Sequence, residues 1–386
     1  MKKSIIILII MLFQWGLQAQ NFDNLTFGTD STLEVVTWNI EWFPKNGTTT
    51  INYVTQIIKA LDVDILAIQE IKDTNAFKQM MSNLDGFDYY FRSGYFAGLG
   101  YIYKTEFIEI NDIYQIYTTN PYWRPFPRAP MVIDFNFQNQ NYIVFDNHFK
   151  CCGDGSMNLN NPDDEETRRY EAANLLKEYI DTHFADKNVM IVGDLNDLLE
   201  DNEQNNVFKN IINDFQNYYF ATSDIVTGTN ANWSYPSWPS HLDHIIITNE
   251  LFDEFENESS VVQTIRIDDY FSSWSQYDKY VSDHRPVGFK FTPNATVGLN
   301  KLEATKKLTV RPNPFRTETT FEFETLQDNT HLEIYDIRGQ LIFTDIIQAG
   351  EGQYTWSPTN GESGVYFSRL RTNSETTIPV KLLIIR

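Results

Sequence analysis

The stretch Asn188 to Asp197, NVMIVGDLND, decides how the rest of this chain is organised. Its apolar part is short and rich in valine and isoleucine, which predicts a strand buried on both faces. Gly193 frees the backbone at the end of this strand, and we expect Asp194 and Asn196, two apart on an extended segment, to point to one side. Asp and Asn also form Asx turns readily, so the stretch alone leaves a plain turn as an equal alternative.

Polar side chains follow other apolar strands of the chain in the same way. They are Asn39 in TWNIEW, Glu70 in AIQE, His148 in DNHFK, Asp243 in LDHIII, and Asp283 with His284 in SDHRP. Carboxylates and amides at strand ends, without the cysteine and histidine spacing of zinc sites, suit a hard cation such as Mg²⁺. Two histidines and separate carboxylates supply the acid, base and orienting group that hydrolysis of a phosphate ester requires. Taken singly, Asn39 and Glu70 fit helix caps better than ligands.

Strand and helix patterns alternate around these motifs. The sequence predicts an α/β body with a large mixed sheet core, arranged as two sheets with helices outside. An acidic run over 154–166 precedes the longest helix, where it matches the helix dipole; structural Ca²⁺ is the alternative there. Expected strands cover 33–40, 63–69, 88–92, 101–104, 131–137, 142–149, 189–192, 241–248, 261–267 and 287–291, and expected helices cover 51–61 and 163–183.

The net charge of the chain limits the classes of binding partner that we expect. The 386 residues include 52 acidic and 30 basic ones, a net charge of −22. The body therefore lacks the broad basic footprint that drives tight, salt-sensitive binding of nucleic acid. A phosphate substrate remains compatible with this charge if divalent cations supply local positive charge.

Residues 1–20 have the layout of a secretory signal, with Lys2 and Lys3 before the apolar run Ile5 to Phe13. The run is too short to cross a membrane, and no other stretch qualifies, so we expect no transmembrane segment after signal removal and a soluble, secreted monomer. The two cysteines, Cys151 and Cys152, are adjacent. A vicinal disulfide and a pair of free thiols are equal alternatives, because secretion favours oxidation while the geometry is poor.

The character of the chain changes after Thr292. We expect a polar linker over 293–307 and a small β-sandwich over 308–386, where short alternating strands recur between turn residues, with a hairpin turn at Arg338–Gly339. No cluster of titratable groups occurs in this tail sequence. A structural or attachment module is therefore the preferred interpretation.

The motifs WNI, IQE, GDLN, LDHI and SDHRP, in this order between Leu33 and Phe291, resemble the endonuclease/exonuclease/phosphatase superfamily. The resemblance implies a four-layered α/β sandwich, which we place at 31–292. It implies that Mg²⁺, or Mn²⁺ in its place, is bound by the oxygen ligands of three residues: Asn39, Glu70 and Asp283.

The same resemblance assigns roles to the remaining motif residues. Asp194 would orient or deprotonate the attacking water while Asn196 holds the phosphate, and Asp243 would pair with His284 and fix its tautomer. His148 resembles a second histidine that faces the phosphate in the deoxyribonuclease and sphingomyelinase branches. Arg128 in FPRAP resembles an arginine that contacts phosphate in those branches, although it could simply pair with an acid.

Other residues invite a functional interpretation that we weigh against a plain one. His241 and His244 bracket Asp243, but we treat both as structural. The aromatic residues near the last two motifs could stack on a base, yet packing is the preferred role because aromatic side chains bury large areas. These residues are Trp233, Tyr235, Trp238 and Trp274.

The tail resembles the C-terminal sorting domain of the type IX secretion system. RPNPF, IYDIRGQ, GVYFSRL and the terminal VKLLIIR, between Leu308 and Arg386, carry this resemblance. It implies handling by the type IX machinery and a secreted or cell-surface-attached protein.

These observations predict a secreted, divalent-metal-dependent phosphodiesterase, an endonuclease acting on extracellular DNA or RNA. The alternative enzyme is a phosphatase or a sphingomyelinase-like phosphoesterase. An inactive binding or adhesion module is the alternative from another class, and the complete set of acids, amides and histidines disfavours it.

Overall fold

The computed structural model describes residues 21–294, 308–323, 329–336, 341–358, 363–371 and 380–384. These residues form two compact units, divided between Asn294 and Ala295. The expected signal segment, nearly all of the expected linker and an expected turn at Arg338–Gly339 lie outside the described residues. No helix in the described part of the chain is long and apolar enough to cross a membrane.

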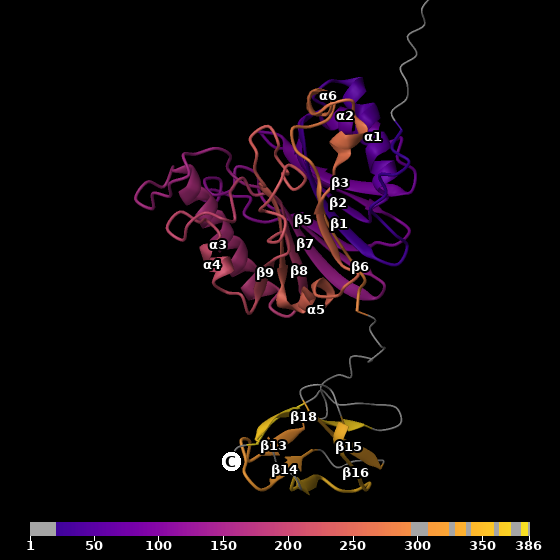
Figure 1. Ribbon diagram of the computed structural model, residues 1–386, viewed down its shortest axis with the longest axis vertical. Helices are drawn as coiled ribbons and strands as arrows, with labels where there is room; N and C mark the ends of the chain where they lie inside the picture. The colour runs from indigo at the N-terminus through magenta and orange to yellow at the C-terminus, as the bar shows by residue number, and fades with distance from the viewer. Residues whose placement is uncertain are drawn as a thin grey trace, which may run out of the picture. The chain divides into compact units, whose positions relative to one another are not determined.

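The first unit is built from two six-stranded sheets packed face to face (Figure 1). One sheet has the order β11 (Val261–Thr264), β12 (Val287–Phe291), β1 (Leu33–Phe43), β2 (Ile65–Ile71), β4 (Gly98–Lys104), β3 (Phe87–Arg92). The other has the order β5 (Glu109–Gln115), β6 (Met131–Phe137), β7 (Gln140–His148), β8 (Asn188–Asp194), β10 (Asp243–Thr248), β9 (Tyr218–Phe220).

Helices cover the outer face of each sheet. The first sheet carries α1 (Thr48–Leu61), α2 (Thr74–Met81) and α6 (Trp274–Tyr280), and the second carries α3 (Glu165–His183) and α4 (Lys209–Ile212). Short helical turns complete the unit: η1 (Asn249–Leu251), α5 (Phe252–Phe255) and η2 (Ile267–Tyr270). The four layers confirm the fold class expected from the sequence.

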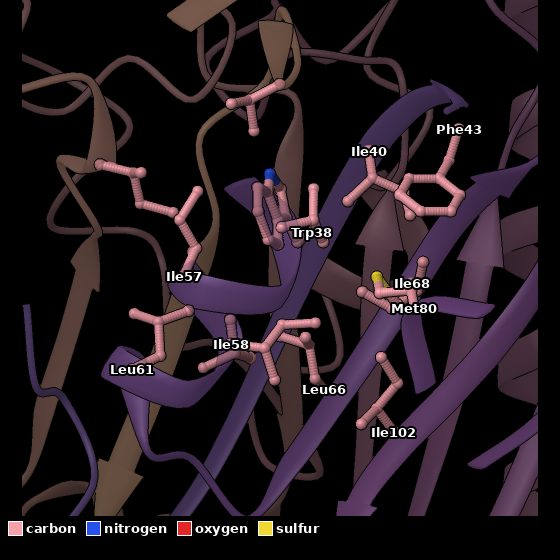
Figure 2. Packing of buried hydrophobic residues seen from close by; sticks show 14 of the residues in the cluster. Trp38, Ile40, Phe43, Ile57, Ile58, Leu61, Leu66, Ile68, Met80 and Ile102 are labelled. Carbon is pink, nitrogen blue, oxygen red and sulfur yellow. The ribbon is translucent and has the colours of Figure 1, made fainter. Parts of the chain in front are cut away.

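The period of two along each strand explains how the layers hold together. In β1, Val36 and Trp38 face the helices while Val35 faces the opposite sheet. Figure 2 shows Trp38 beside Ile57 and Ile58 of α1. Burying side chains of this size contributes roughly 1.5–3 kcal/mol each, so both faces of a central strand stabilise the fold.

The short elements β9, α4, α5, α6 and η1 were not expected, and three further differences have a clear cause. The exposed edge strand β5 was missed because its polar sequence EINDIYQ lacks a clear apolar alternation. The helix α2 was missed because it is only eight residues long, although the Asp73 side chain accepts hydrogen bonds from Asn75 N and Ala76 N at its start. The strand expected over 261–267 ends at Thr264, and Ile267 begins the turn η2.

The second unit consists of two small antiparallel sheets with a shared apolar core, as expected for the tail. Trp356, Phe321 and Ile334 are buried in that core. One sheet has the order β13 (Thr309–Arg311), β14 (Thr319–Glu322), β17 (Gln353–Trp356), and the other has the order β16 (Leu341–Ile347), β15 (Thr330–Asp336), β18 (Gly364–Arg371), β19 (Val380–Ile384).

A buried acid pair beneath β1 and β2 makes the stability of the first unit depend on pH. Oδ2 of Asp64 accepts the backbone N–H of Glu34 at 3.3 Å, and both side chains are buried. Burial raises the pKa of Glu34 to about 8, and repulsion from Asp64 adds to the rise. The folded state thus binds a proton that the unfolded chain, with an ordinary pKa of 4.5, releases.

The stability due to protonated Glu34 is therefore present below the unfolded pKa of 4.5 and is lost as pH rises through about 8. The side chain introduced by Glu34→Gln stays neutral at every pH. We therefore expect the melting temperature of this variant to fall less between pH 5 and pH 8 than that of the parent protein. Circular dichroism melts at several pH values test this. Parallel melting curves for the two proteins would contradict it.

Candidate active site

Strand register brings three of the expected residues to one point. At the end of β8, Asp194 is paired with His148 of the parallel strand β7 and with Asp243 of the antiparallel strand β10. Directly opposed residues on neighbouring strands project to the same face of a sheet. The preceding Gly193 has a φ of 142°, and a Cβ there would lie 2.0 Å from the carbonyl oxygen of Asn147. Only glycine fits where the chain delivers Asp194 to the site.

The ring of His284 is held by Asp243. Nδ1 of His284 lies 2.8 Å from Oδ2 of Asp243, and both side chains are buried. The hydroxyl of Tyr277 donates to the carbonyl oxygen of His284 at 2.6 Å, which fixes the backbone as well. Burial lowers the pKa of His284, but the carboxylates of Asp243 and Asp194 outweigh burial and hold this pKa well above its usual value. The ring is therefore a cation at neutral pH.

Asp194 lies between the two histidines. Its Oδ2 is 3.6 Å from Nε2 of His284 and 3.4 Å from Nε2 of His148, and it accepts a hydrogen bond from Asn39 Nδ2 at 3.0 Å. Burial raises the pKa of Asp194 to about 7, against the opposing effect of the His284 cation. A carboxylate with a pKa near 7 is matched to accepting a proton at neutral pH.

His148 has the opposite protonation preference. Burial lowers its pKa well below the usual value, and the positive charges of Arg128 and His284 lower it further. His148 is therefore a neutral ring whose Nε2 lies 3.8 Å from Oε1 of Glu70. Environments that push the pKa values of two histidines apart are typical of a site that divides acid and base roles.

Asn39 and Glu70 lie side by side at the ends of β1 and β2. Nδ2 of Asn39 is 3.3 Å from Oε1 of Glu70, and Oε2 of Glu70 accepts the backbone N–H of Trp42 at 2.9 Å. Glu70 has a φ of 68° at a break in the strand register, a strained position of the kind that functional sites retain. Neither residue caps a helix, because Gly47 and Asp73 precede α1 and α2. The capping alternative is wrong for both.

The donor atoms present fit a hard divalent cation. Glu70, Asn39 and Asp283 offer carboxylate and amide oxygens, and Oδ1 of Asp283 is buried with no hydrogen-bond partner in the described structure. A cation would satisfy such an oxygen, which is costly to bury alone. Asp194, Asp243 and His284 also bring donor atoms within 4.8 Å of one another. The high pKa of His284 and its bond to Asp243 oppose a cation at that second cluster.

Glu41 is a member of the site that the sequence interpretation missed. Its Oε2 accepts the backbone N–H of Asp283 at 2.9 Å and also bonds to Lys45. Burial raises the pKa of Glu41, and the neighbouring carboxylate of Asp283 adds to the rise. Its place two residues after Asn39, in TWNIEW, was the available signal.

Asn196 lies at the site in a backbone conformation that differs from the expected one. Its φ is 55°, so the extended segment stops at Asp194 and the expected two-residue spacing along a strand is wrong. The backbone N–H of Asn196 donates to Oδ1 of Asp194 at 3.2 Å, which is an Asx turn. The Asx turn is therefore part of the site, since Asn196 also lines the pocket described below.

Arg128 makes no ion pair with any residue that the structure describes. The alternative role, simple pairing with an acid, is therefore not observed. One terminal nitrogen donates to the carbonyl oxygen of Phe96 at 3.2 Å, and Nε is buried without a partner. Burial lowers the pKa of Arg128, whereas the charges of Glu70 and Asp194 act to raise it. The guanidinium therefore lies within the electrostatic reach of the site carboxylates with hydrogen-bonding capacity to spare.

A buried arginine of α3, also missed, links the two loops that follow His148 and Asp194. Nε of Arg169 donates to Asp197 Oδ2 at 2.7 Å, and one terminal nitrogen donates to the carbonyl oxygens of Lys150 and Cys152 at 2.7 Å each. The other terminal nitrogen lies 3.2 Å from Oε1 of Glu166. Arg169 thus sets the spacing between segments that follow β7 and β8. Nothing in its helical sequence context distinguishes it from a surface arginine.

The remaining singled-out groups have plain roles. The ring nitrogens of His244 contact Thr222 Oγ1 at 3.2 Å and the carbonyl oxygen of Asp197 at 2.9 Å, and His241 Nδ1 contacts the carbonyl oxygen of Asn232 at 2.7 Å. Both are structural, as expected. In the acidic run, Asp164 caps α3 by accepting the Thr167 N–H at 2.9 Å, which supports the helix-start interpretation. The two cysteines are free and exposed.

Most of the site residues, though not Arg128 or Asp243, line one pocket with a volume of about 460 Å³. Residues at the strand ends line it together with the aromatic side chains of Trp42, Tyr235 and Trp238 and the loop residues Cys151, Cys152 and Gly153. Its lining residues are Asn39, Glu41, Trp42, Glu70, His148, Cys151, Cys152, Gly153, Gly155, Glu166, Arg169, Asp194, Asn196, Asp197, Leu198, Asp201, Tyr235, Trp238, Leu242, Asp283 and His284.

This chain has a four-layered sandwich with carboxylates, amides and two histidines at the ends of neighbouring strands. This arrangement is typical of phosphoesterase hydrolases. The chain belongs to the Endonuclease/Exonuclease/phosphatase family, whose model matches residues 36–284. A second family model, the secretion system C-terminal sorting domain, matches residues 309–386. This domain indicates secretion or attachment to the cell surface, and it confirms the resemblance of the tail.

Solved structures resemble this chain at low sequence identity. TDP2 of D. rerio, complexed with single strand DNA product, is 12% identical with a TM-score of 0.51, over 68% of this chain and 99% of that chain. The human Nocturnin catalytic domain with bound sulfate is 16% identical with a TM-score of 0.47, over 68% and 94%. An endonuclease/exonuclease/phosphatase from Bacteroides vulgatus is 15% identical with a TM-score of 0.47, over 67% and 98%. No curated protein matches the chain.

Proposed function

We propose that the protein is a secreted, divalent-metal-dependent phosphodiesterase that cuts extracellular DNA or RNA internally, and that residues 1–20 are its secretory signal. The observation that carries the activity is the continuous set of contacts from Asp243 through His284 and Asp194 to Asn39 and Glu70. These contacts support the proposal because they bring together a cationic imidazole, a carboxylate poised to accept a proton and the side-chain oxygens of Asn39 and Glu70. Hydrolysis of a phosphate ester needs these three functions together.

In this proposal the protein groups divide the work. Asp194 orients the attacking water and accepts its proton. The His284 imidazolium, fixed by Asp243, holds negative charge as it develops on the phosphate. His148, Arg128 and Asn196 donate hydrogen bonds to the phosphate oxygens.

Asn39, Glu70 and Asp283 would hold the divalent cation, for which Mg²⁺ is our proposal. The cation supplies Lewis-acid polarisation of a phosphate oxygen when bound. Glu41 fixes the backbone of Asp283 through the hydrogen bond at 2.9 Å and so positions that ligand.

A comparison of substrates with and without chelator tests the proposal. Purified protein is incubated with plasmid DNA, RNA, sphingomyelin and inositol phosphates, and products are quantified. We expect cleavage of nucleic acid that chelator abolishes and added Mg²⁺ restores. Turnover restricted to sphingomyelin or inositol phosphates would overturn the nuclease assignment. Absence of turnover on every substrate would support a binding module instead.

A further inference from the structure

Two tryptophans of the pocket are unusually exposed. Trp42 is 46% exposed and Trp238 is 65% exposed, and both line the pocket that contains Asp194 and His284. Packing in the core or at the surface was the expected role of Trp238, and its exposure excludes the core. A large aromatic ring left in water beside a catalytic pocket is available to a ligand.

The catalytic residues themselves fix the position of Trp42. Its backbone N–H donates to Oε2 of Glu70 at 2.9 Å, and its φ of 46° falls within the irregularity between Asn39 and Phe43 in the pairing of β1 with β2. Nζ of Lys72 lies 5.1 Å from the centre of the Trp42 ring. The ring is therefore held beside a proposed metal ligand and carries a cation on its face.

Trp238 is placed with respect to His284 by a closed turn. Tyr235 and Ser240 pair across this turn, with Tyr235 N–H donating to the Ser240 carbonyl oxygen at 3.1 Å. The Ser240 hydroxyl donates to the Trp238 carbonyl oxygen at 2.6 Å, and the Tyr235 ring packs 4.8 Å from the His284 ring. The turn therefore places Trp238 at the pocket that His284 also lines.

The charge of the pocket lining indicates which kind of contact provides affinity for a nucleic acid. Seven carboxylic side chains line it against one guanidinium, that of Arg169, which is already engaged by Asp197 and Glu166. Attraction of the phosphate backbone by a basic surface is therefore weak here. Stacking of bases on aromatic rings contributes about 1–3 kcal/mol per base without any basic surface, and it requires bases that are not paired in a duplex.

Building on the nuclease function proposed above, we infer that Trp42 and Trp238 stack on unpaired bases next to the scissile phosphate, so that the substrate is single-stranded nucleic acid. A lipid surface fits less well. Both rings border the pocket that holds the carboxylates rather than a separate apolar face, which a lipid surface would require. Affinity should accordingly vary little with salt concentration.

Steady-state kinetics on a single-stranded oligonucleotide tests the inference. We expect Trp42→Ala and Trp238→Ala each to lower kcat/KM by about 5- to 140-fold, the equivalent of 1–3 kcal/mol per base, and Trp238→Phe to restore most of the loss. Trp123→Ala is the matched control, because Trp123 is 62% exposed but lies outside the pocket lining. It should retain parental activity.

A second substrate identifies the contact as stacking. An oligomer with abasic positions around the scissile phosphate should be cut more slowly by the parent protein. The losses from removing the bases and from removing a ring should not multiply, because both remove one contact. Equal cutting of a duplex and a single strand, or unchanged kcat/KM in both alanine variants, would overturn the inference. So would tryptophan fluorescence that shifts with phosphatidylcholine and sphingomyelin vesicles but not with oligonucleotides.

Binding measured in chelator separates this inference from the proposed function. Quenching of tryptophan fluorescence by an oligonucleotide reports stacking without turnover, and it should weaken in Trp42→Ala and Trp238→Ala. Quenching without hydrolysis of any phosphoester would reject the nuclease activity and keep the stacking site. Hydrolysis without quenching would reject the stacking site alone.

Discussion

Replacement of His284 with alanine is expected to reduce kcat by about 10²- to 10⁴-fold or more, the range for removal of a general acid–base group. The physical reason is the loss of a buried cation whose charge is maintained by Asp243 and Asp194. The variant should still fold and bind the metal, with a lower melting temperature because Asp243 loses its buried partner. Thermal melts and calorimetric titration of Mn²⁺ check both. The exposed His183 at the end of α3 provides the control, since His183→Ala should retain parental kcat.

The orienting role of Asp243 is tested in the same series. Asp243→Asn keeps the shape of the side chain but removes its charge, so kcat should fall less than in His284→Ala. The double substitution should be no slower than His284→Ala alone, because residues that act as a unit give non-additive losses. Losses that multiply in folded, metal-binding variants would show that Asp243 acts independently of His284.

Replacement of Arg169 with methionine is expected to have the largest effect on stability, a loss of about 3–5 kcal/mol in the free energy of unfolding. The substitution leaves Asp197 and Glu166 buried without their positive partner. Denaturant titration measures the change. The exposed pair of Arg124 with Glu171 is the matched control, and Arg124→Met should cost no more than about 1 kcal/mol.

Arg169 also predicts a catalytic effect that a purely structural residue would lack. Variants that remain folded at low temperature should show a lower kcat, because Arg169 sets the spacing of the loops that directly follow His148 and Asp194. Asp197→Asn retains a hydrogen-bond acceptor and should show a smaller loss of both stability and kcat. Unchanged kcat in folded Arg169→Met would limit the arginine to a structural role.

The strand-end residues were predictable because their positions follow from local pattern. A short apolar run followed by a polar residue fixes where a strand ends, and parallel or paired strands then bring those ends to one edge. Asn39, Glu70 and Asp194 were found in this way, and the structure brings them within hydrogen-bonding range. The roles assigned to them remain proposals that the variants above test.

Other features were invisible to local pattern because tertiary contacts determine them. Arg169 sits in an ordinary helical sequence, and only the fold brings Lys150 and Asp197 to its guanidinium. The conformation of Asn196 depends on a single positive φ that the sequence GDLND does not reveal. The exposure of Trp238 depends on a turn closed by Tyr235 and Ser240, so composition alone favoured burial.

The register around Asp194 makes catalysis a reporter of correct assembly. Asp194 faces His148 and Asp243 only because β7, β8 and β10 pair as they do. A slip of one residue in either neighbour would turn its side chain to the opposite face and also move apolar residues out of the core. Misassembled molecules should therefore be silent in an activity assay, so specific activity after refolding measures the fraction of chains whose strands are in their native alignment.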